Sequence, residues 1–139
     1  MRRKIAYIAV IIILPVLMIA ASCGGDDSVN FVFNQVPSDC AAVKQSTENM
    51  SCAGSVFTFN GSVVTPNPCN YLKAEMDFIN KSNIMIKINA VSTLDQNGYC
   101  IECLGGISFN GTVDLAGVCS KTLSIVYNGT TIAEYEQGH

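Results

Sequence analysis

Histidine is almost absent from this chain. The only one, His139, is the last of 139 residues, where chains usually fray. A Ser-His, Cys-His or histidine–metal arrangement therefore cannot be built within a fold. Covalent haem is excluded as well, because Cys103 is followed by Leu104 and not by histidine. The glycines are scattered and form no phosphate-cradling loop. The sequence thus predicts no catalytic residues, no metal site and no cofactor, and it favours a protein that is not an enzyme.

Arginine is absent beyond Arg3. After residue 22 the chain carries five lysines and all eleven acidic residues, a formal net charge of −6. A domain without arginine and with a negative field is poorly equipped to bind phosphates or planar carboxylates. Nucleic acid is therefore not expected as a partner, and the acidity mainly favours solubility.

Residues 1–22 have the organisation of an export signal. A basic start at residues 2–4 precedes the uncharged residues 5–21, and the small residues Ala20-Ala21-Ser22 stand at the break. The uncharged run of 17 residues is at the lower limit of the ~17–25 residues that a membrane-spanning helix needs, and Pro15 lies inside it. An uncleaved membrane anchor is the alternative.

The end of this segment, Ile19-Ala20-Ala21-Ser22-Cys23-Gly24-Gly25, resembles a bacterial lipoprotein signal, although leucine is usual where Ala20 stands. The resemblance covers the N-terminus alone. It implies that the signal is removed and that Cys23 becomes the lipidated first residue. Two or more acyl chains would hold stably, because each buried methylene contributes ~0.8 kcal/mol. The alternative is a free cysteine after an ordinary signal, or a seventh cysteine in a disulfide network.

Residues 24–28 are predicted to form a short tether. Gly24-Gly25-Asp26-Asp27 is flexible and polar, the wrong setting for a buried thiol, and it is better explained as solvated chain than as a calcium site. Fully extended, these residues span roughly 20 Å, so the domain would sit close to the bilayer. We therefore expect an exported protein whose partner is a membrane, to which a lipid anchors it. The anchor would lie at the outer face of the cytoplasmic membrane, in the outer membrane or on the cell surface.

Period-2 alternation dominates residues 29–139 and predicts strands. The clearest run is 72–78, where Leu72, Ala74, Met76 and Phe78 are interleaved with charged residues. The other alternating runs are 29–34, 57–60, 84–90, 107–115 and 123–127, and the hairpin pair Asn128-Gly129 joins the last to a returning run at 130–136. Six to eight short strands with one polar face each predict an all-β fold, an antiparallel β-sandwich.

The remaining segments connect these runs. Residues 80–83 join two of them as a short hairpin loop, and Thr65-Pro66-Asn67-Pro68 marks a strand end. Residues 38–50 lack alternation. There Ser38 or Asp39 could cap a short helix over residues 41–43, or the segment is an irregular loop clipped by cysteines.

The number and spacing of the strands resemble an immunoglobulin-like or fibronectin type III-like sandwich. Pro68-Cys69, Leu72 and Cys100-Ile101-Glu102-Cys103 are similar to the pattern of exported sandwich domains. The tryptophan of antibody domains is absent, since the chain has none. The resemblance implies an architecture and no activity.

An even number of cysteines remains when Cys23 is set aside, which predicts disulfides in an oxidising compartment. They are Cys40, Cys52, Cys69, Cys100, Cys103 and Cys119. Cys100-x-x-Cys103 lies in an apparent strand, where positions three apart are roughly 10 Å from each other, too far for a bridge. Each is therefore expected to pair elsewhere, and structural bridges are favoured over a redox-active dithiol or a zinc site. The connectivity stays open, with Cys40–Cys52 the preferred first pair by proximity.

Two other polar patterns have both a functional and a structural explanation. Five N-x-S/T sequons indicate glycosylation of an exported protein, although N-G-S/T is also turn or polar-face chemistry. Their asparagines are Asn49, Asn60, Asn80, Asn110 and Asn128. Glu75 and Asp77 share one strand face, ~7 Å apart, beside Lys73. Paired carboxylates can do acid–base work, but a solvated sheet face is favoured.

The leading functional hypothesis is a cell-envelope lipoprotein whose non-catalytic sandwich binds an envelope protein or assembles with one. The first alternative is a filament or surface-layer subunit, in which residues 29–36 are donated as a strand to a neighbour's sheet edge. The second is an exported thiol-disulfide oxidoreductase that uses Cys100 and Cys103.

Overall fold

The computed structural model describes residues 28–38, 40, 44–94 and 98–137. The signal, Cys23, the tether up to Asp27, the helix considered at residues 41–43 and His139 lie outside the described residues. The described part consists of eight strands and one short 3₁₀ helix, η1. Their bounds are β1 (Asn30–Ser38), β2 (Ser46–Ala53), β3 (Val56–Thr65), β4 (Asn70–Phe78), β5 (Asn83–Ser92), β6 (Gly105–Asp114), η1 (Val118–Ser120), β7 (Thr122–Tyr127) and β8 (Thr130–Tyr135).

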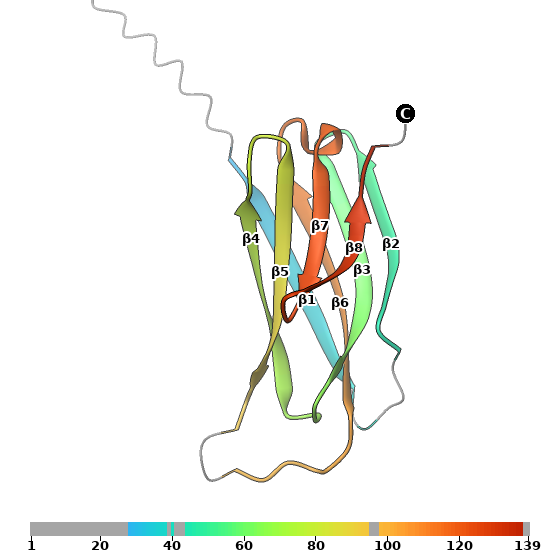
Figure 1. Ribbon diagram of the computed structural model, residues 1–139, viewed down its shortest axis with the longest axis vertical. Helices are drawn as coiled ribbons and strands as arrows, with labels where there is room; N and C mark the ends of the chain where they lie inside the picture. The colour runs from blue at the N-terminus through green and yellow to red at the C-terminus, as the bar shows by residue number, and fades with distance from the viewer. Residues whose placement is uncertain (1–27, 39, 41–43, 95–97, 138–139) are drawn as a thin grey trace, which may run out of the picture.

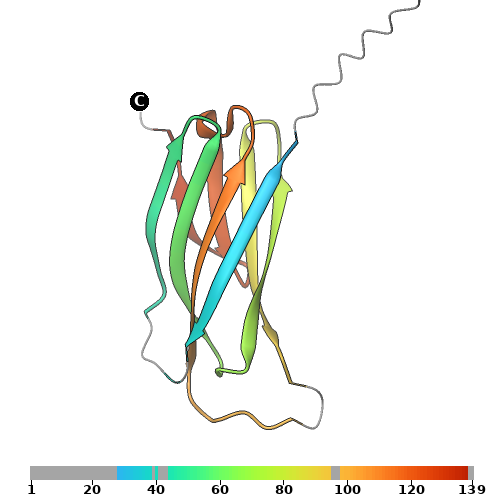
Figure 2. The same cartoon turned by 180° about the vertical axis from the view of Figure 1, so that it is seen from behind.

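The strands form two four-stranded sheets that pack face to face (Figures 1 and 2), which confirms the predicted two-layered all-β fold. Sheet A has the order β1-β6-β3-β2 and sheet B the order β4-β5-β7-β8. The expectation of wholly antiparallel sheets is wrong at one place, because β5 and β7 are parallel. Between these two strands the chain crosses to sheet A and runs back along the sandwich as β6. It therefore re-enters sheet B at the end where β5 began.

The strand order differs from that of an immunoglobulin constant domain. In that fold the first, second, fifth and fourth strands form one sheet, and the third, sixth and seventh form the other. Here β6 lies between β1 and β3, and β5 belongs to the second sheet. The structure therefore shares with immunoglobulin-like sandwiches only the coarser architecture of two packed β-sheets.

Most of the alternating runs are strands with their apolar residues turned inward. The clearest examples are β5 and β6, where Ile84, Ile86 and Ile88 are buried and Ile107, Phe109 and Val113 are buried opposite them. The sequence missed β2, because no strand was predicted within residues 46–53. Its alternation is interrupted by a register shift between Thr47 and Asn49, and β2 lies at the edge of its sheet.

The turns follow their local sequences. Asn128 and Gly129 both have positive φ, 45° and 83°, and connect β7 to β8 as predicted. At residues 79–83 the backbone N–H of Ile79 donates to the carbonyl of Asn83, which closes the β4–β5 hairpin. β3 ends at Thr65, immediately before the two prolines.

The centre of the core is aromatic, and two glycines make room for it. Where β3 pairs with β6, Phe59 lies opposite Gly111 and Phe109 lies opposite Gly61. A Cβ at position 111 would lie 2.3 Å from Cζ of Phe59, and one at position 61 would lie 2.9 Å from Cζ of Phe109. These Asn-Gly pairs therefore lie in mid-strand and not in turns, with the asparagine toward the outer face and the glycine toward the core.

We expect Gly111→Ala to lower the free energy of unfolding by about 1–3 kcal/mol, because the added methyl group overlaps the Phe59 ring and the Val32 carbonyl. Chemical denaturation followed by fluorescence or circular dichroism measures this. Ser108→Ala, on the exposed face of the same strand, is the control and should change stability by less than about 0.5 kcal/mol. Equal stability of the two variants would contradict the proposed role of the glycine.

Two polar contacts link the sheets. The Gln35 amide of β1 donates to the carbonyl of Leu72 on β4 at 2.8 Å, and its oxygen accepts the Leu72 N–H at 2.6 Å. It therefore satisfies both backbone groups of a buried residue at the edge of sheet B, as a neighbouring strand would. The Tyr127 hydroxyl of β7 donates to the carbonyl of Val64 on β3 at 2.8 Å. Burial raises the pKa of the Tyr127 phenol above its ordinary value.

We expect Tyr127→Phe to lower the free energy of unfolding by about 1 kcal/mol at neutral pH, because the Val64 carbonyl loses its donor. The pKa of Tyr127 is raised by folding, so its contribution is complete below the unfolded-state pKa, ~10, and is lost as pH rises through the folded-state pKa. The difference in stability between wild type and variant should therefore shrink above pH ~10. Denaturation curves from neutral to alkaline pH measure it, and a pH-independent difference would contradict this assignment.

Candidate functional site

The longest connection between strands is the segment from residue 93 to residue 104, which joins β5 to β6 at one end of the sandwich (Figure 1). Connections of about 12 residues are longer than usual and are often functional. The chain leaves sheet B after Ser92 and enters sheet A at Gly105, so this segment spans both layers. The sequence placed residues 99–104 in a strand. That is wrong, because residues 98–104 have no strand structure.

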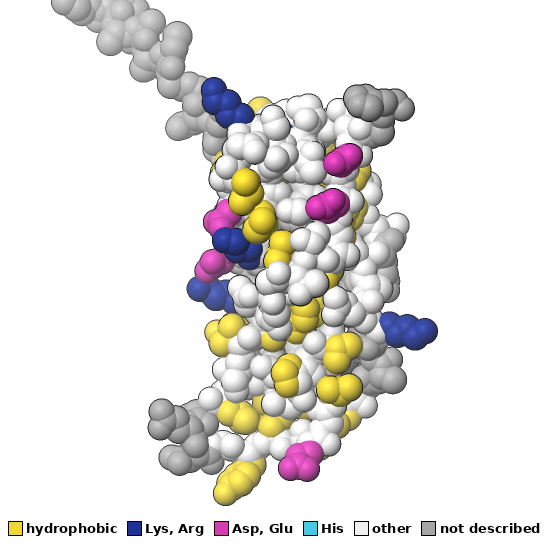
Figure 3. All heavy atoms as spheres, in the orientation of Figure 1, with side chains coloured by type: hydrophobic (Ala, Val, Ile, Leu, Met, Phe, Trp, Pro, Cys, Tyr) yellow, Lys and Arg dark blue, Asp and Glu magenta, His cyan; other side chains and the backbone are white. Residues whose placement is uncertain are grey.

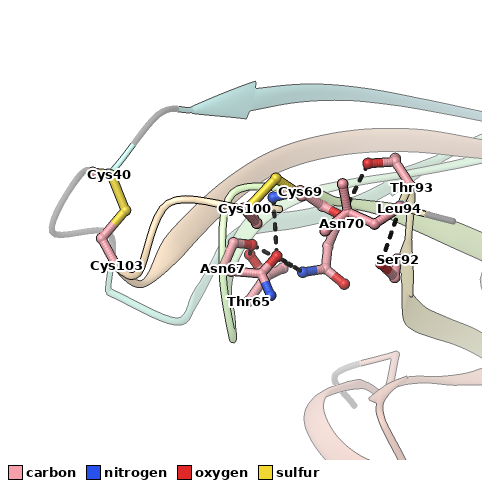
Figure 4. Close-up of a disulfide and its surroundings, with 10 residues drawn as sticks. All are labelled: Cys40, Thr65, Asn67, Cys69, Asn70, Ser92, Thr93, Leu94, Cys100 and Cys103. Carbon is pink, nitrogen blue, oxygen red and sulfur yellow. Dashed lines mark hydrogen bonds between the residues drawn. A yellow bond between two sulfur atoms is a disulfide. The ribbon is translucent and has the colours of Figure 1, made fainter. Parts of the chain in front are cut away.

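Two disulfides hold this segment, which we call the end loop (residues 98–104). Cys100 bonds to Cys69, just before β4, and Cys103 bonds to Cys40, just after β1. The Cα–Cα distances are 6.0 and 5.6 Å. The two cysteines of the C-x-x-C motif therefore pair elsewhere, as predicted, although the strand argument for it was wrong. Each sulfur joins the end loop to a different sheet (Figure 4).

The preferred pair Cys40–Cys52 is wrong, because Cys52 bonds to Cys119 of η1. β2 runs along the sandwich between Cys40 and Cys52, so residues 12 apart in sequence lie at opposite ends of the molecule. The prediction from sequence proximity did not include a strand between these two cysteines. All six cysteines are consequently paired, at the two ends of the sandwich and not across its core.

A hydrogen-bonded turn supports the end loop from below (Figure 4). Asn67 is its centre: its side-chain oxygen accepts the N–H of Cys69 at 3.0 Å and the amide of Asn70 at 2.8 Å. The carbonyl of Asn67 accepts the hydroxyl of buried Thr65 at 2.8 Å. The carbonyl of Cys69 accepts the N–H of Thr93 at 2.9 Å, which ties the start of the β5–β6 connection to the same turn.

Gly105 is required where the end loop enters β6. A Cβ at this position would lie 2.5 Å from the Thr65 hydroxyl oxygen and 2.6 Å from the Asn67 carbonyl oxygen. The backbone of β6 therefore approaches the turn so closely that a side chain has no room. Together with the two disulfides, this contact gives the end loop a rigid base.

The end loop carries three large apolar side chains in water. Tyr99 is 98% exposed, Ile101 70% and Leu104 63%. Beside them is a hollow of about 420 Å³, lined by Pro66 and Asn67 of the turn and by residues 100–104. Hydrophobic side chains gather toward this end of the face shown in Figure 3. This surface was not predicted, because the pattern placed these residues in a strand. Apolar residues beside two cysteines in a long connection were the available signal.

The lining of this hollow offers one ionisable side chain, Glu102. The side chain of Asn67 is already engaged within its turn. In the described part of the chain no group of three or more histidine, cysteine or acidic side chains is placed to hold a metal ion. The chemistry available at the end loop is therefore apolar contact with one carboxylate beside it.

The carboxylates of β4 are separately paired with lysines. Glu75 lies 2.7 Å from Nζ of Lys73, and Asp77 forms an ion pair with Lys87 of β5. The hydrogen bond and charge of Glu75 raise the pKa of Lys73, and Asp77 acts in the same way on Lys87. All four side chains are well exposed. This is the arrangement of a solvated sheet face, as the sequence analysis favoured.

Three of the five sequon asparagines lie in one row across the outer face of sheet A. Asn110 of β6 is in register with Asn60 of β3, which is in register with Asn49 of β2, and Asn34 of β1 extends the row. The Asn34 amide donates to the Asn110 side-chain oxygen at 3.3 Å. The other two sequons lie at hairpins, where the side-chain oxygens of Asn80 and Asn128 accept backbone N–H groups of Ser82 and Ala90.

Residues 29–36, considered as a donated strand, belong to this chain's own sheet. From Asn30 to Ser38 the segment pairs in register with β6. Phe31 and Phe33 pack against the core, and β1 lies at the edge of sheet A with Val32 and Val36 exposed. Among the described residues, no helix is both long and apolar enough to cross a bilayer.

No protein-family model, no curated protein and no solved structure matches this chain. What the chain does is therefore inferred from its own residues.

Removing the Cys69–Cys100 bridge by alanine substitution of both residues should loosen the end loop selectively. We expect a loss of about 2–4 kcal/mol in unfolding free energy and faster amide hydrogen exchange in residues 98–104 and 66–70. The matched control removes Cys52–Cys119, which should cost a similar amount and leave exchange in the end loop unchanged under native conditions. Equal protection of the end loop in both variants would contradict the stapling role of Cys69–Cys100.

Proposed function

We propose that this chain is an exported, lipid-anchored protein of the cell envelope whose sandwich is a non-catalytic binding module, and that the end loop is its contact surface. Three disulfides in a small β-sandwich are typical of an oxidising compartment outside the cytoplasm. The lipoprotein-like sequence around Cys23 supports the anchor. The proposal keeps one functional aspect of immunoglobulin-like and fibronectin type III-like domains, in which strands form a scaffold and loops at one end make contacts.

The exposure of Tyr99, Ile101 and Leu104 carries the proposal. Several large apolar side chains exposed to water on one short loop are costly for a monomer and typically mark an interaction site. Aromatic and aliphatic anchors of this kind supply most of the energy of protein interfaces. Because two disulfides already restrict the loop, little conformational entropy is lost when a partner binds.

The expected partner is a protein. The lining of the hollow has few polar groups converging on it, whereas small-molecule sites use several to orient a ligand. A protein surface with an apolar patch, and a cationic group to meet Glu102, fits the end loop. We therefore expect another envelope protein as the partner.

The anchor is tested by intact and peptide mass analysis of the protein from its native cell. We expect the chain to begin at Cys23 and to carry acyl chains there, since the signal would be removed during lipidation. A mature chain that keeps residues 1–22, or a Cys23 peptide of unmodified mass, would contradict the anchor.

The contact surface is tested by replacing Tyr99, Ile101 and Leu104 together with serine. We expect a photo-cross-linking residue placed at Glu102 to give a discrete protein adduct in native membranes, and the triple variant to lose it at least tenfold, the loss of about 1.4 kcal/mol or more. The control is Val32→Ser with Val36→Ser, which removes two exposed apolar side chains, 41% and 65% exposed, from β1. An adduct that survives in the triple variant, or is lost equally in the control, would contradict the assignment.

A further inference from the structure

The end of the sandwich opposite the end loop carries a second apolar surface, and this one is cationic. It surrounds a hollow of about 450 Å³ that is lined by Val29, Phe78, Leu115, Ala116 and two lysines, Lys81 and Lys121. Ile79, next to Phe78, is also exposed. We call the surface formed by Val29, Phe78, Ile79, Lys81 and Lys121 the basal patch.

Strand register brings these five residues to one end of the molecule. Val29 precedes β1, whose first residue, Asn30, pairs with Asp114 at the end of β6. Phe78 ends β4, and Lys81 lies in the hairpin that follows it. Lys121 precedes β7, whose first residue pairs with Asn83 at the start of β5. The end loop precedes β6 and is therefore at the far end of that strand (Figures 1 and 2).

The basal patch combines apolar exposure with positive charge. Val29 is 37% exposed, Phe78 50% and Ile79 55%. The Lys121 ammonium donates to the backbone carbonyl of Lys81, and both lysines line the same hollow. Within the part of the chain that the structure describes, neither lysine forms an ion pair with a carboxylate, unlike Lys73 and Lys87. Residues 23–139 are acidic overall, so these two lysines form a local positive region.

The proposed lipid on Cys23 would place a membrane next to this patch. Val29 is six residues after Cys23, so an extended tether separates the two Cα atoms by at most about 21 Å. A lipid on Cys23 would therefore hold the basal patch, and not the end loop, toward the bilayer. Exposed aromatic and aliphatic side chains bordered by lysines suit the headgroup layer, where ammonium groups meet anionic phospholipid.

We propose that the basal patch is a membrane-contact surface that seats on anionic headgroups of the same bilayer that holds the lipid of Cys23. The inference rests on the proposed lipid anchor. Seating the domain at this end directs the end loop away from the membrane, toward a partner in the compartment beyond. The ligand class is anionic phospholipid, and the anchored tether supplies a high local concentration of it.

The test uses the acylated mature protein in nanodiscs of phosphatidylcholine, with or without phosphatidylglycerol. We expect amide hydrogen exchange in the hairpin at residues 79–82 to slow about fivefold or more when phosphatidylglycerol is present, the contribution of about one membrane-bound lysine. Lys81→Gln with Lys121→Gln should abolish this dependence on lipid charge. Lys44→Gln with Lys73→Gln makes the same change in net charge elsewhere and should preserve it.

Each outcome has a distinct meaning. Acylated protein whose hairpin exchanges equally on both nanodiscs, or a control that behaves like the Lys81/Lys121 variant, overturns the basal patch and leaves the anchor intact. Protection on both nanodiscs that disappears with Asp26→Asn and Asp27→Asn overturns it in favour of the acidic tether as occupant. An unmodified Cys23 mass overturns the anchor and, with it, the inference.

Discussion

Three times this chain crosses from one sheet to the other, and a disulfide holds each crossing. Cys69 lies between β3 and β4, Cys100 and Cys103 lie between β5 and β6, and Cys119 lies between β6 and β7. A segment that crosses between layers cannot satisfy its backbone within a sheet and is the place where a small sandwich opens most easily. Covalent bonds at these places leave the strands free to pack a dry core. The sulfur bridges are therefore at the ends, and packed apolar side chains hold the two sheets together between them.

The two ends of the sandwich differ in surface chemistry from each other and from its sides. The sides of the sandwich carry polar groups, with the lysine–carboxylate pairs of β4 and β5 on one sheet and the asparagine row on the other. The end loop displays apolar side chains on a covalently braced base, and the opposite end displays apolar side chains with two lysines. A rigid body with chemically distinct ends can join two structures at a defined orientation. This is what a protein between a membrane and a partner has to do.

The strands were predictable where a period-2 pattern is reinforced by burial on one face, as in β5 and β6. β2 was not, because its bulge breaks the pattern and an edge strand buries fewer of its residues. The sequence left open whether the Asn-Gly pairs lie in turns or on the polar face of a strand. Asn-Gly is a strong turn signal at residues 128–129, but at 60–61 and 110–111 the same dipeptide lies opposite a phenylalanine of the neighbouring strand. Only the pairing partner distinguishes the two cases, and local sequence does not contain it.

The sequence by itself determined the all-β class, most strand positions and the need for disulfides. These depend on side-chain alternation, composition and cysteine number, which are local properties of the chain. The tertiary structure alone decided which cysteines meet, that β5 and β7 run parallel, and that Tyr99, Ile101 and Leu104 face water together. Each of these depends on which residues distant in sequence lie side by side, and that follows from the packing of the two sheets as a whole.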